Sequence, residues 1–547
     1  MWWRRHASKV AVGLIGFFAG VWGVGVGEVP LFDWDEVNFA ECAREMRVSG
    51  NYLYPQIGFL PFWEKPPLFF WVQAGFMAIF GENAWGARLP NVFISALTLA
   101  VLYYLGRRWH GEGFGLTWLF LQGVSLLPSF YARSGLIDPL FNLFMLLATV
   151  CGAYAVEKGR LGWALGMGFC AGLATLTKGP VGLLMPAVAV GTLLLFRRQL
   201  PRIGVLLLGG GLAFGMVVGP WLALLLQSDG GKLLADFWAY QWRLFSTPDA
   251  GHGGPWYYHL VVVAVGMFPA SLWAIGAWRL PFRKLPAPAQ ALLWLTTWTL
   301  VVFSIVKTKI LHYSSLSYYG VSYLAAWVWL YHRRWIWRTG GVLTGLIGLL
   351  LAIGTLCVGV IMHFWPRWIQ QIKDPFMQAA IQNTPLDWEG TEGWPGFVLA
   401  GGLAVLYLLP WKNTGRLGLL GLVCLLWEAL MLRQLAGRVE AYTQAPLRQF
   451  CTEKAQEGAL VWPVGFKSYI PFFYGQMSPD ASPAVVGDTD LFQQKLLAGE
   501  MPFPVYFVSR VDRYKPFQEA HHLEIVEQRG AYVLLAPPYR GPGQAGK

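Results

Sequence analysis

The chain has 547 residues, of which 55% are hydrophobic and only 13% are charged, and its mean hydropathy is +0.44. Soluble domains carry about 25% charged residues, so this composition excludes an ordinary soluble protein and predicts a polytopic membrane protein. The net charge of +12 comes from Lys and Arg residues that lie between the apolar runs. Membrane topology explains that placement, and we expect no nucleic-acid partner.

Apolar runs recur along the chain at a length close to that of a membrane-spanning helix. Such a helix needs roughly 20 mostly apolar residues, and somewhat fewer when it packs among other helices. The sequence therefore predicts about thirteen spans. They lie near residues 10–28, 88–106, 114–131, 138–156, 161–177, 179–196, 203–226, 258–277, 289–306, 313–331, 340–364, 395–410 and 417–433.

The basic residues set the orientation of these spans, because short cytoplasmic loops are enriched in Lys and Arg. If the N-terminus is cytoplasmic, every connector expected in the cytoplasm is basic. These connectors carry Arg107/Arg108, Lys158/Arg160, Arg197/Arg198/Arg202, Arg279/Arg283/Lys284, Arg333/Arg334/Arg338 and Lys412/Arg416. An odd number of spans then places the C-terminus outside.

The membrane domain, residues 1–433, includes a long external segment with helices expected at 30–87. Val37, Ala40, Ala43 and Met46 recur every three residues among charged ones, which predicts an amphipathic helix on the membrane surface. Residues 67–81 are apolar but too few to span, and they predict a re-entrant or interfacial helix.

Beyond residue 433 the composition becomes that of a soluble domain. Charged and turn-forming residues separate short β-rich runs at 458–465, 504–510 and 531–538. Residues 434–547 therefore predict a small α/β domain outside the membrane.

Three of the carboxylates at the outer face in this topology are candidates for catalysis. Asp35 and Glu36 follow the first span, and Asp138 begins a later span just before Pro139. Helix capping or acids in a first helical turn would explain all three residues. A carboxylate at the membrane boundary is also a functional candidate, so we consider Asp35, Glu36 and Asp138 as catalytic residues.

Basic residues also lie at the outer face, although the rule that enriches Lys and Arg in cytoplasmic loops does not predict them there. Lys65 precedes two prolines that stiffen its backbone, Lys178 lies in a tight turn between spans, and Lys307, Lys309 and His312 form a cluster. Lysines near the membrane edge also extend their amines to lipid headgroups. Taken together, these cations favour a site for an anion, such as a phosphate.

Glu64 and His252 are a candidate pair of metal ligands, although they are far apart in sequence. His252 is equally compatible with a phosphate contact or an ordinary interfacial histidine. No P-loop is evident, so we expect no nucleotide cofactor. A lipid-linked phosphate fits these charges, with its headgroup at the cations and its tail in the bilayer.

The motifs resemble, in order, those of the type C, polyprenyl-phosphate-dependent glycosyltransferases. They are "DWDEVNFAECAREM", "EKPPL", "LIDPLFN", "LTKGP", "HGGPWYY" and "KTKILHYSSLSYY", between about residues 10 and 320. Within that group the chain is most similar to the bacterial aminoarabinose transferases that modify lipid A and to the protein O-mannosyltransferases.

The resemblance implies roles for individual residues. Asp35 would be the principal catalytic carboxylate, Asp138 a second acid, and Lys65 the ligand of the donor phosphate. It also implies a structural zinc ion at Glu64 and His252. Aminoarabinose transferases have an Arg-Tyr pair where this chain has Asn38 and Phe39, so the expectation stops at the type of reaction.

The implied reaction moves a sugar from a carrier such as undecaprenyl phosphate to a lipid, glycan or protein acceptor, with inversion at the anomeric carbon. The resemblance implies a multi-pass protein of the bacterial inner membrane whose active site faces the periplasm. The alternative from another class is a transporter or flippase of polyprenyl-linked lipids, in which the same cations would guide a headgroup across the membrane.

Overall fold

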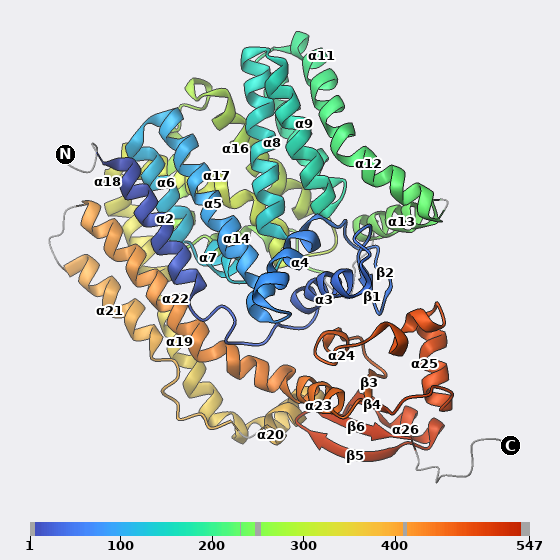
Figure 1. Cartoon of the computed structure of the whole chain (residues 1–547). Helices are drawn as coiled ribbons and strands as arrows, with labels where there is room; N and C mark the ends of the chain where they lie inside the picture. Colours follow the sequence, from blue (N-terminus) through green and yellow to red (C-terminus); the bar gives the residue numbers. More distant parts are fainter. Residues whose placement is uncertain (1–5, 230, 247–252, 385, 409–412, 538–547) are drawn as a thin grey trace.

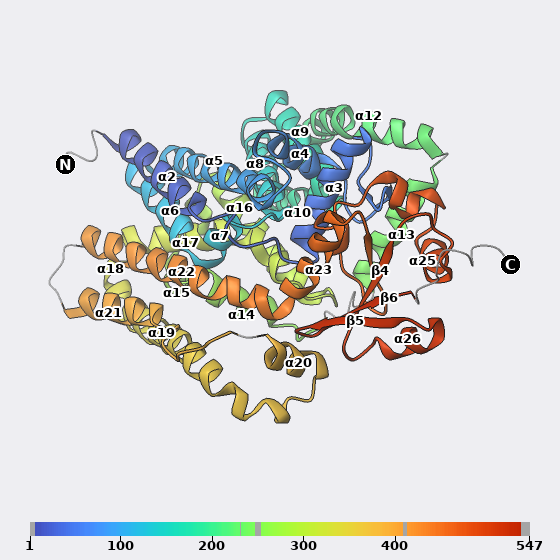
Figure 2. The same cartoon turned by 60° about the horizontal axis from the view of Figure 1, so that its bottom comes forward.

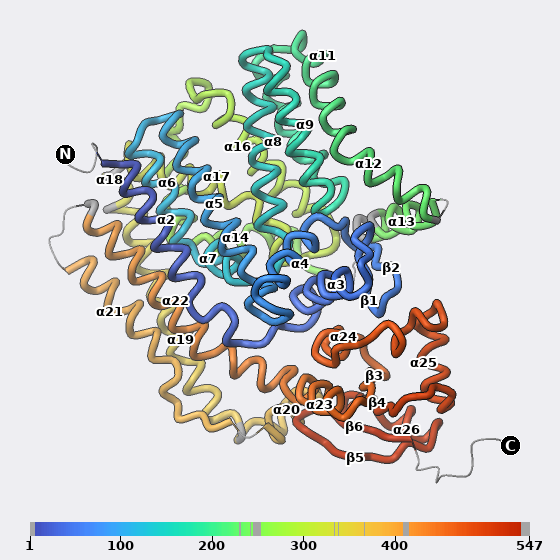
Figure 3. Tube along the Cα trace, in the orientation of Figure 1, coloured from blue at the N-terminus to red at the C-terminus, as the bar shows by residue number. Residues whose placement is uncertain are grey.

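The computed structural model describes residues 6–229, 231–246, 253–384, 386–408 and 413–537, and most of them are helical. The long helices form one bundle, and the C-terminal strands lie beyond one end of it (Figure 1). The first described helix, Ala7–Gly23 (α2), begins near the opposite end of the bundle from that sheet (Figure 3).

Six helical segments are long and apolar enough to cross a membrane, or eight if each of two bent pairs is one span. The six are Ala84–His110 (α5), Asp138–Lys158 (α8), Leu200–Ser228 (ending in α12, Gly211–Asp229), Ala287–Ile305 (α16), Arg338–Phe364 (ending in α19, Gly341–Phe364) and Gly415–Thr443 (within α22, Asn413–Thr443).

The first bent pair joins Glu112–Val124 (α6) to Leu126–Ala132 (α7) at 73°. The second joins Tyr258–Gly266 (α14) to Ala270–Arg279, which begins with α15 (Ala270–Ala274), at 109°. Eight of the thirteen predicted spans coincide with these segments. The other five coincide with shorter helices, and their crossing of the membrane stays a prediction. These helices are Ala7–Gly23 (α2), Leu161–Lys178 (α9), Val181–Phe196 (α10), Tyr318–Tyr331 (α17) and Pro395–Leu408 (α21).

The segment between α2 and α5 folds into two helices and a two-stranded turn. Helix α3 is Asp35–Ser49, α4 is Leu68–Phe80, and the short strands are Gln56–Ile57 (β1) and Leu60–Pro61 (β2). Pro67 precedes α4, which packs against α3 and α5.

The expected helix is present as α3, but it is not the exposed amphipathic helix that the sequence pattern predicts. All residues of α3 from Glu36 to Met46 are buried, and the helix contacts α4 on one side and Ile470–Phe473 (α24) on another. Its charged side chains are buried because they have partners. Glu41 accepts two hydrogen bonds from Arg44, and Glu45 accepts the backbone N–H groups of Gly58 and Phe59.

After α22 the chain forms a four-stranded mixed sheet in the order β3, β4, β6, β5. The strands are Leu460–Pro463 (β3), Val505–Arg510 (β4), Glu524–Arg529 (β5) and Tyr532–Ala536 (β6). β3 runs parallel to β4, and the other two pairs are antiparallel. The helices of this region, besides α24, are Ala445–Gln456 (α23), Thr489–Ala498 (α25) and Lys515–His521 (α26).

Three of these strands fall on the β-rich runs of the sequence, and β5 was not predicted. The sheet, α3 and Lys232–Ser246 (α13) gather at the same end of the bundle (Figure 2). The end of the bundle that carries α3 is therefore enclosed by segments from the middle and the end of the chain.

Candidate active site

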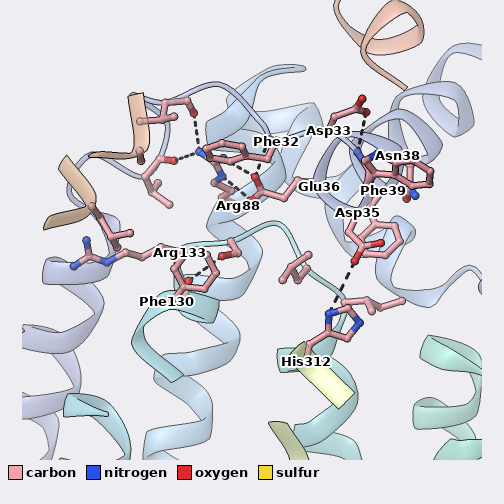
Figure 4. Close-up of a pocket in the computed structure, with 18 of the residues that line it drawn as sticks. Phe32, Asp33, Asp35, Glu36, Asn38, Phe39, Arg88, Phe130, Arg133 and His312 are labelled. Atoms are coloured by element: carbon pink, nitrogen blue, oxygen red, sulfur yellow. Dashed lines mark hydrogen bonds and ion pairs between the residues drawn. The ribbon is translucent and has the colours of Figure 1, made fainter. Parts of the chain in front are cut away.

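A cavity of about 1100 Å³ lies at this enclosed end of the bundle. Its walls come from the segment between α2 and α3, from α13 and α22, and from the loop Lys467–Tyr469 of the C-terminal region. Ionisable lining residues include Asp35, Lys65, Lys178 and His312, which lie on four separate parts of the chain. Figure 4 shows Asp35 pointing toward His312, with Glu36 and Arg88 paired on another side.

Asp35 is the first residue of α3 and presents its carboxylate to this cavity. Trp34, just before it, has φ 69° and ψ −118°, a left-handed conformation that is unusual for a residue with a side chain. The Asp35 side chain is 48% exposed, and its Oδ2 lies 4.0 Å from Nδ1 of His312. A carboxylate this open can reach a bound molecule.

Asp138, Lys178 and His312 form a buried charged cluster behind Asp35. Lys178 Nζ lies 2.6 Å from Asp138 Oδ1, and His312 Nε2 lies 3.9 Å from Asp138 Oδ2. Asp138 Oδ2 has no hydrogen-bond partner within the part of the chain that the structure describes. Burial lowers the pKa of His312, and the nearby lysines act in the same direction against the two carboxylates. The imidazole therefore favours its neutral form.

Lys65 extends into the same cavity from the segment before α4. Its Nζ lies 5.7 Å from the centroid of the Tyr240 ring, and the Arg243 guanidinium lies 5.0 Å from that same ring. Burial lowers the pKa of Lys65 and the charge of Lys178 adds to this, while Glu64 opposes it. Lys65 and Lys178 are close enough to repel each other, so a bound anion would stabilise the charged forms of both.

Two of the predicted phosphate ligands lie elsewhere. Lys309 Nζ donates to the carbonyl oxygens of Phe303, Ser304 and Val306, at distances of 2.8, 2.8 and 2.6 Å. It thereby satisfies the C-terminal carbonyls of α16. Lys307 is exposed, and neither lysine lines the cavity. The prediction that Lys307 and Lys309 face a donor phosphate is therefore not supported by their positions, whereas His312 of the same cluster does face the cavity.

Glu36 has both carboxylate oxygens occupied. Oε1 accepts from Arg88 Nε at 2.8 Å and Gly135 N at 2.7 Å, and Oε2 accepts from Arg88 Nη2 at 2.6 Å and Phe32 N at 3.1 Å. Burial would raise the pKa of Glu36, but the charge and hydrogen bonds of Arg88 outweigh it and the pKa is lowered. This arrangement suits a residue that holds the backbone around Asp35 rather than one that contacts a reactant.

The two structural alternatives for the other carboxylates have different outcomes. Trp34 and Ile137 occupy the N-caps of α3 and α8, so Asp35 and Asp138 do not cap these helices, but both lie in the first helical turn, as the other alternative predicts. Asp138 also binds Lys178, 40 residues further along the chain.

Several lining residues were missed by the sequence reasoning. They include Tyr240 and Arg243 of α13, Arg133, Tyr313, Lys467 and Tyr469. Arg133 and Arg243 could have been found, because both are basic and external in the predicted topology, like Lys178. The remaining positions carry no such signal, since they reach the cavity only through the fold.

The metal site stays a prediction. Glu64 lines the cavity, but His252 lies outside the described residues. Among the described residues, no three His, Cys, Asp or Glu side chains are grouped so as to hold a metal ion.

Comparison with known proteins places this geometry in context. Residues 64–223 match the family model described as dolichyl-phosphate-mannose-protein mannosyltransferase. The chain is 29% identical over 293 residues to the undecaprenyl phosphate-alpha-4-amino-4-deoxy-L-arabinose arabinosyl transferase of Erwinia tasmaniensis, an alignment that covers 51% of this chain and 52% of that one. In this alignment the chain therefore spans about half the length of that relative. A second transferase of the same description, from Sodalis glossinidius, is 25% identical with 98% of this chain and 99% of that protein aligned.

Among solved structures, the chain resembles ArnT from Cupriavidus metallidurans bound to undecaprenyl phosphate. The TM-score is 0.76 at 21% sequence identity, covering 96% of this chain and 97% of that one. The likeness at this identity shows the fold. The predicted resemblance to the polyprenyl-phosphate-dependent glycosyltransferases is confirmed.

Proposed function

We propose that the chain is a glycosyltransferase that moves a sugar from a polyprenyl phosphate carrier, such as undecaprenyl phosphate, to a lipid, glycan or protein acceptor. The observation that carries the proposal is that the half-exposed Asp35 and the cations Lys65 and Lys178 line the same cavity. Further support comes from the relatives, whose names specify an undecaprenyl phosphate donor, and from the ArnT structure, whose title names undecaprenyl phosphate as its ligand.

The reaction assigns a role to each charged group. The acceptor oxygen attacks the anomeric carbon, the bond from that carbon to the phosphate oxygen breaks, and the carrier phosphate leaves with the electron pair. Lys65 and Lys178 stabilise the negative charge that develops on this phosphate. Asp35 takes the proton of a hydroxyl acceptor as a general base, and a single displacement inverts the anomeric centre. Asp138 anchors Lys178, with its Oδ1 2.6 Å from the amine.

The proposal includes the arrangement in the membrane. Thirteen helical spans make up residues 1–433, the N-terminus is cytoplasmic, and residues 434–547 form a soluble α/β domain in the periplasm of a bacterium with the site on the same side. The sheet in residues 460–536 supports the α/β fold of that domain. A structural zinc ion held by Glu64 and His252 belongs to the same proposal, and the metal content of purified Glu64→Gln protein tests it.

The first experiment is mass spectrometry of the lipids that co-purify with the wild type and with Lys65→Ala after mild detergent extraction. A polyprenyl phosphate, bare or glycosylated, should be enriched with the wild type and lost with the variant. Lys309→Met is the matched control, because Lys309 is a buried lysine outside the cavity. Bulk phospholipids in equal amounts from all three proteins would contradict the phosphate site.

The second experiment separates a transferase from a flippase. Asp35→Asn should abolish sugar transfer and leave the affinity for the polyprenyl phosphate close to that of the wild type, because the lysines remain. A flippase would tolerate this substitution. Unchanged movement of the lipid across the bilayer together with an absence of transfer by the wild type would therefore favour the flippase.

A further inference from the structure

The short segment that leads into Asp35 is held by residues from the end of the chain. Leu31 N donates to the Tyr474 hydroxyl at 2.7 Å, and Leu31 O accepts from Gln444 Nε2 at 2.7 Å. Asp33 N donates to Gln444 Oε1 at 2.8 Å, and Asp33 Oδ1 accepts from Tyr469 N at 3.0 Å. The partners are more than 400 residues apart in sequence. We call Gln444, Ser468, Tyr469 and Tyr474 the C-terminal clasp.

The clasp acts next to a strained residue. Trp34 has a φ of 69°, which costs free energy for a residue with a Cβ and persists only where the surroundings impose it. Asp33 Oδ1 accepts the Trp34 N–H at 2.8 Å as well as that of Tyr469. The Trp34 and Tyr469 rings meet edge to face with centroids 6.0 Å apart, and the Lys467 amine lies over both rings. The clasp therefore fixes the residue that directs Asp35 toward the cavity.

The Asp33 carboxylate is well suited to join the two parts. Burial raises its pKa, and the Ser468 hydroxyl and the N–H groups of Tyr469 and Trp34 oppose that shift. One oxygen thus connects the backbone of the Asp35 segment to the backbone of the clasp. An amide oxygen in the same place could accept the same two N–H groups.

We propose that the C-terminal clasp is a positioning element of the active site, and that Asp33 is the positioning residue through which it sets the orientation of Asp35. The inference rests on the proposed glycosyl transfer. The C-terminal region is then a part of the catalytic apparatus, because it supplies all four of these hydrogen bonds to Leu31 and Asp33. No other described residue is placed to make them. Lys65 and Lys178 belong to other segments, so the donor phosphate site stays in place when the clasp is loosened.

The test compares turnover with donor affinity in four variants. Gln444→Ala removes two of the four hydrogen bonds, Tyr474→Phe removes one with little change in volume, and Asp33→Ala removes the carboxylate. We expect kcat to fall by about tenfold or more in Gln444→Ala and Asp33→Ala, because catalytic geometry is sensitive to shifts of the order of an ångström. The dissociation constant for polyprenyl phosphate should stay within about twofold. Asp33→Asn should recover much of the turnover lost in Asp33→Ala.

The matched control is Gln493→Ala, since Gln493 accepts a hydrogen bond from Trp462 within the C-terminal region and does not touch the Asp35 segment. Its kcat should equal that of the wild type. Wild-type kcat in both Gln444→Ala and Tyr474→Phe would overturn the inference even if Asp33→Ala fails to fold. So would an equal loss in Gln493→Ala, which would indicate general destabilisation. A wild-type protein that transfers no sugar would instead overturn the proposed function, and faster amide exchange at Trp34 in Gln444→Ala would still report the clasp.

Discussion

Glu36→Gln should destabilise the protein strongly, and the structure sets the expected size. The Glu36 and Arg88 side chains are only 9% and 6% exposed. Each carboxylate oxygen of Glu36 accepts two of the four hydrogen bonds. Glutamine puts an amide NH2 group in place of one oxygen, and this group then faces two N–H donors. It also leaves the Arg88 charge buried without an anion. Breaking a buried pair in this way costs about 3–5 kcal/mol.

The assay is unfolding in mixed micelles with increasing SDS, followed by the fluorescence of the chain's 29 tryptophans. Glu82→Gln is the matched control, because Glu82 pairs with Arg47 at 2.8 Å but the two side chains are 26% and 28% exposed. A pair of that kind contributes about 0–1 kcal/mol. Equal losses of stability in the two variants would refute the reasoning.

The difference in stability between the wild type and Glu36→Gln should depend on pH in a definite direction. The pKa of Glu36 is lowered in the folded protein, so its contribution is present above the pKa of the unfolded chain and is lost as the pH falls through the lowered value. The gap between the wild type and Glu36→Gln should be complete at neutral pH and should narrow below roughly pH 4.3.

Three further outcomes follow from the site. Because the pKa of Lys65 is lowered, its charge is lost at a lower pH than that of a free lysine, so the alkaline limb of the transfer rate should lie below about pH 10.4; Lys65→Arg should move that limb upward. Lys178→Met leaves the buried Asp138 without its partner, so stability should drop by about 3–5 kcal/mol, and Lys178→Met/Asp138→Asn should restore stability without restoring transfer. Lys309→Met should lower stability by about 1–3 kcal/mol, since it leaves helix carbonyls unpaired, with donor affinity unchanged in a binding titration.

The sequence located the end of the bundle that holds the cavity, because the positions of charged residues in a membrane protein reflect both topology and possible binding sites. Cytoplasmic loops attract Lys and Arg for topology, so Lys65 and Lys178 stood out at the opposite face, and the structure places both in the cavity with Asp35. The same search for basic residues at the outer face also selected Lys309 as a phosphate ligand. That prediction failed because the Lys309 ammonium group donates to helix carbonyls within six residues. This contact depends on where α16 ends.

Long-range partners account for most of what the sequence did not predict. From the sequence alone, Glu36 is a candidate catalytic residue. In the structure it is paired with Arg88, which is 52 residues away in the chain. α3 has the pattern of a surface helix, but α24, more than 400 residues later, covers it. β5 was missed because its sequence, EIVEQR, is mainly polar, as suits an edge strand of the sheet.

The contact between Leu31 and Tyr474 also has a consequence for the synthesis of the protein. These residues are 443 positions apart, and a ribosome adds about 5–20 residues per second. Roughly 20–90 s therefore pass between the emergence of the catalytic segment and that of its partner. Throughout that interval the growing chain already carries its membrane helices and its lysines, but Asp35 is not yet held in place. If the clasp has the proposed role, the site is complete only near the end of translation, when the last fifth of the chain has folded against the first helices.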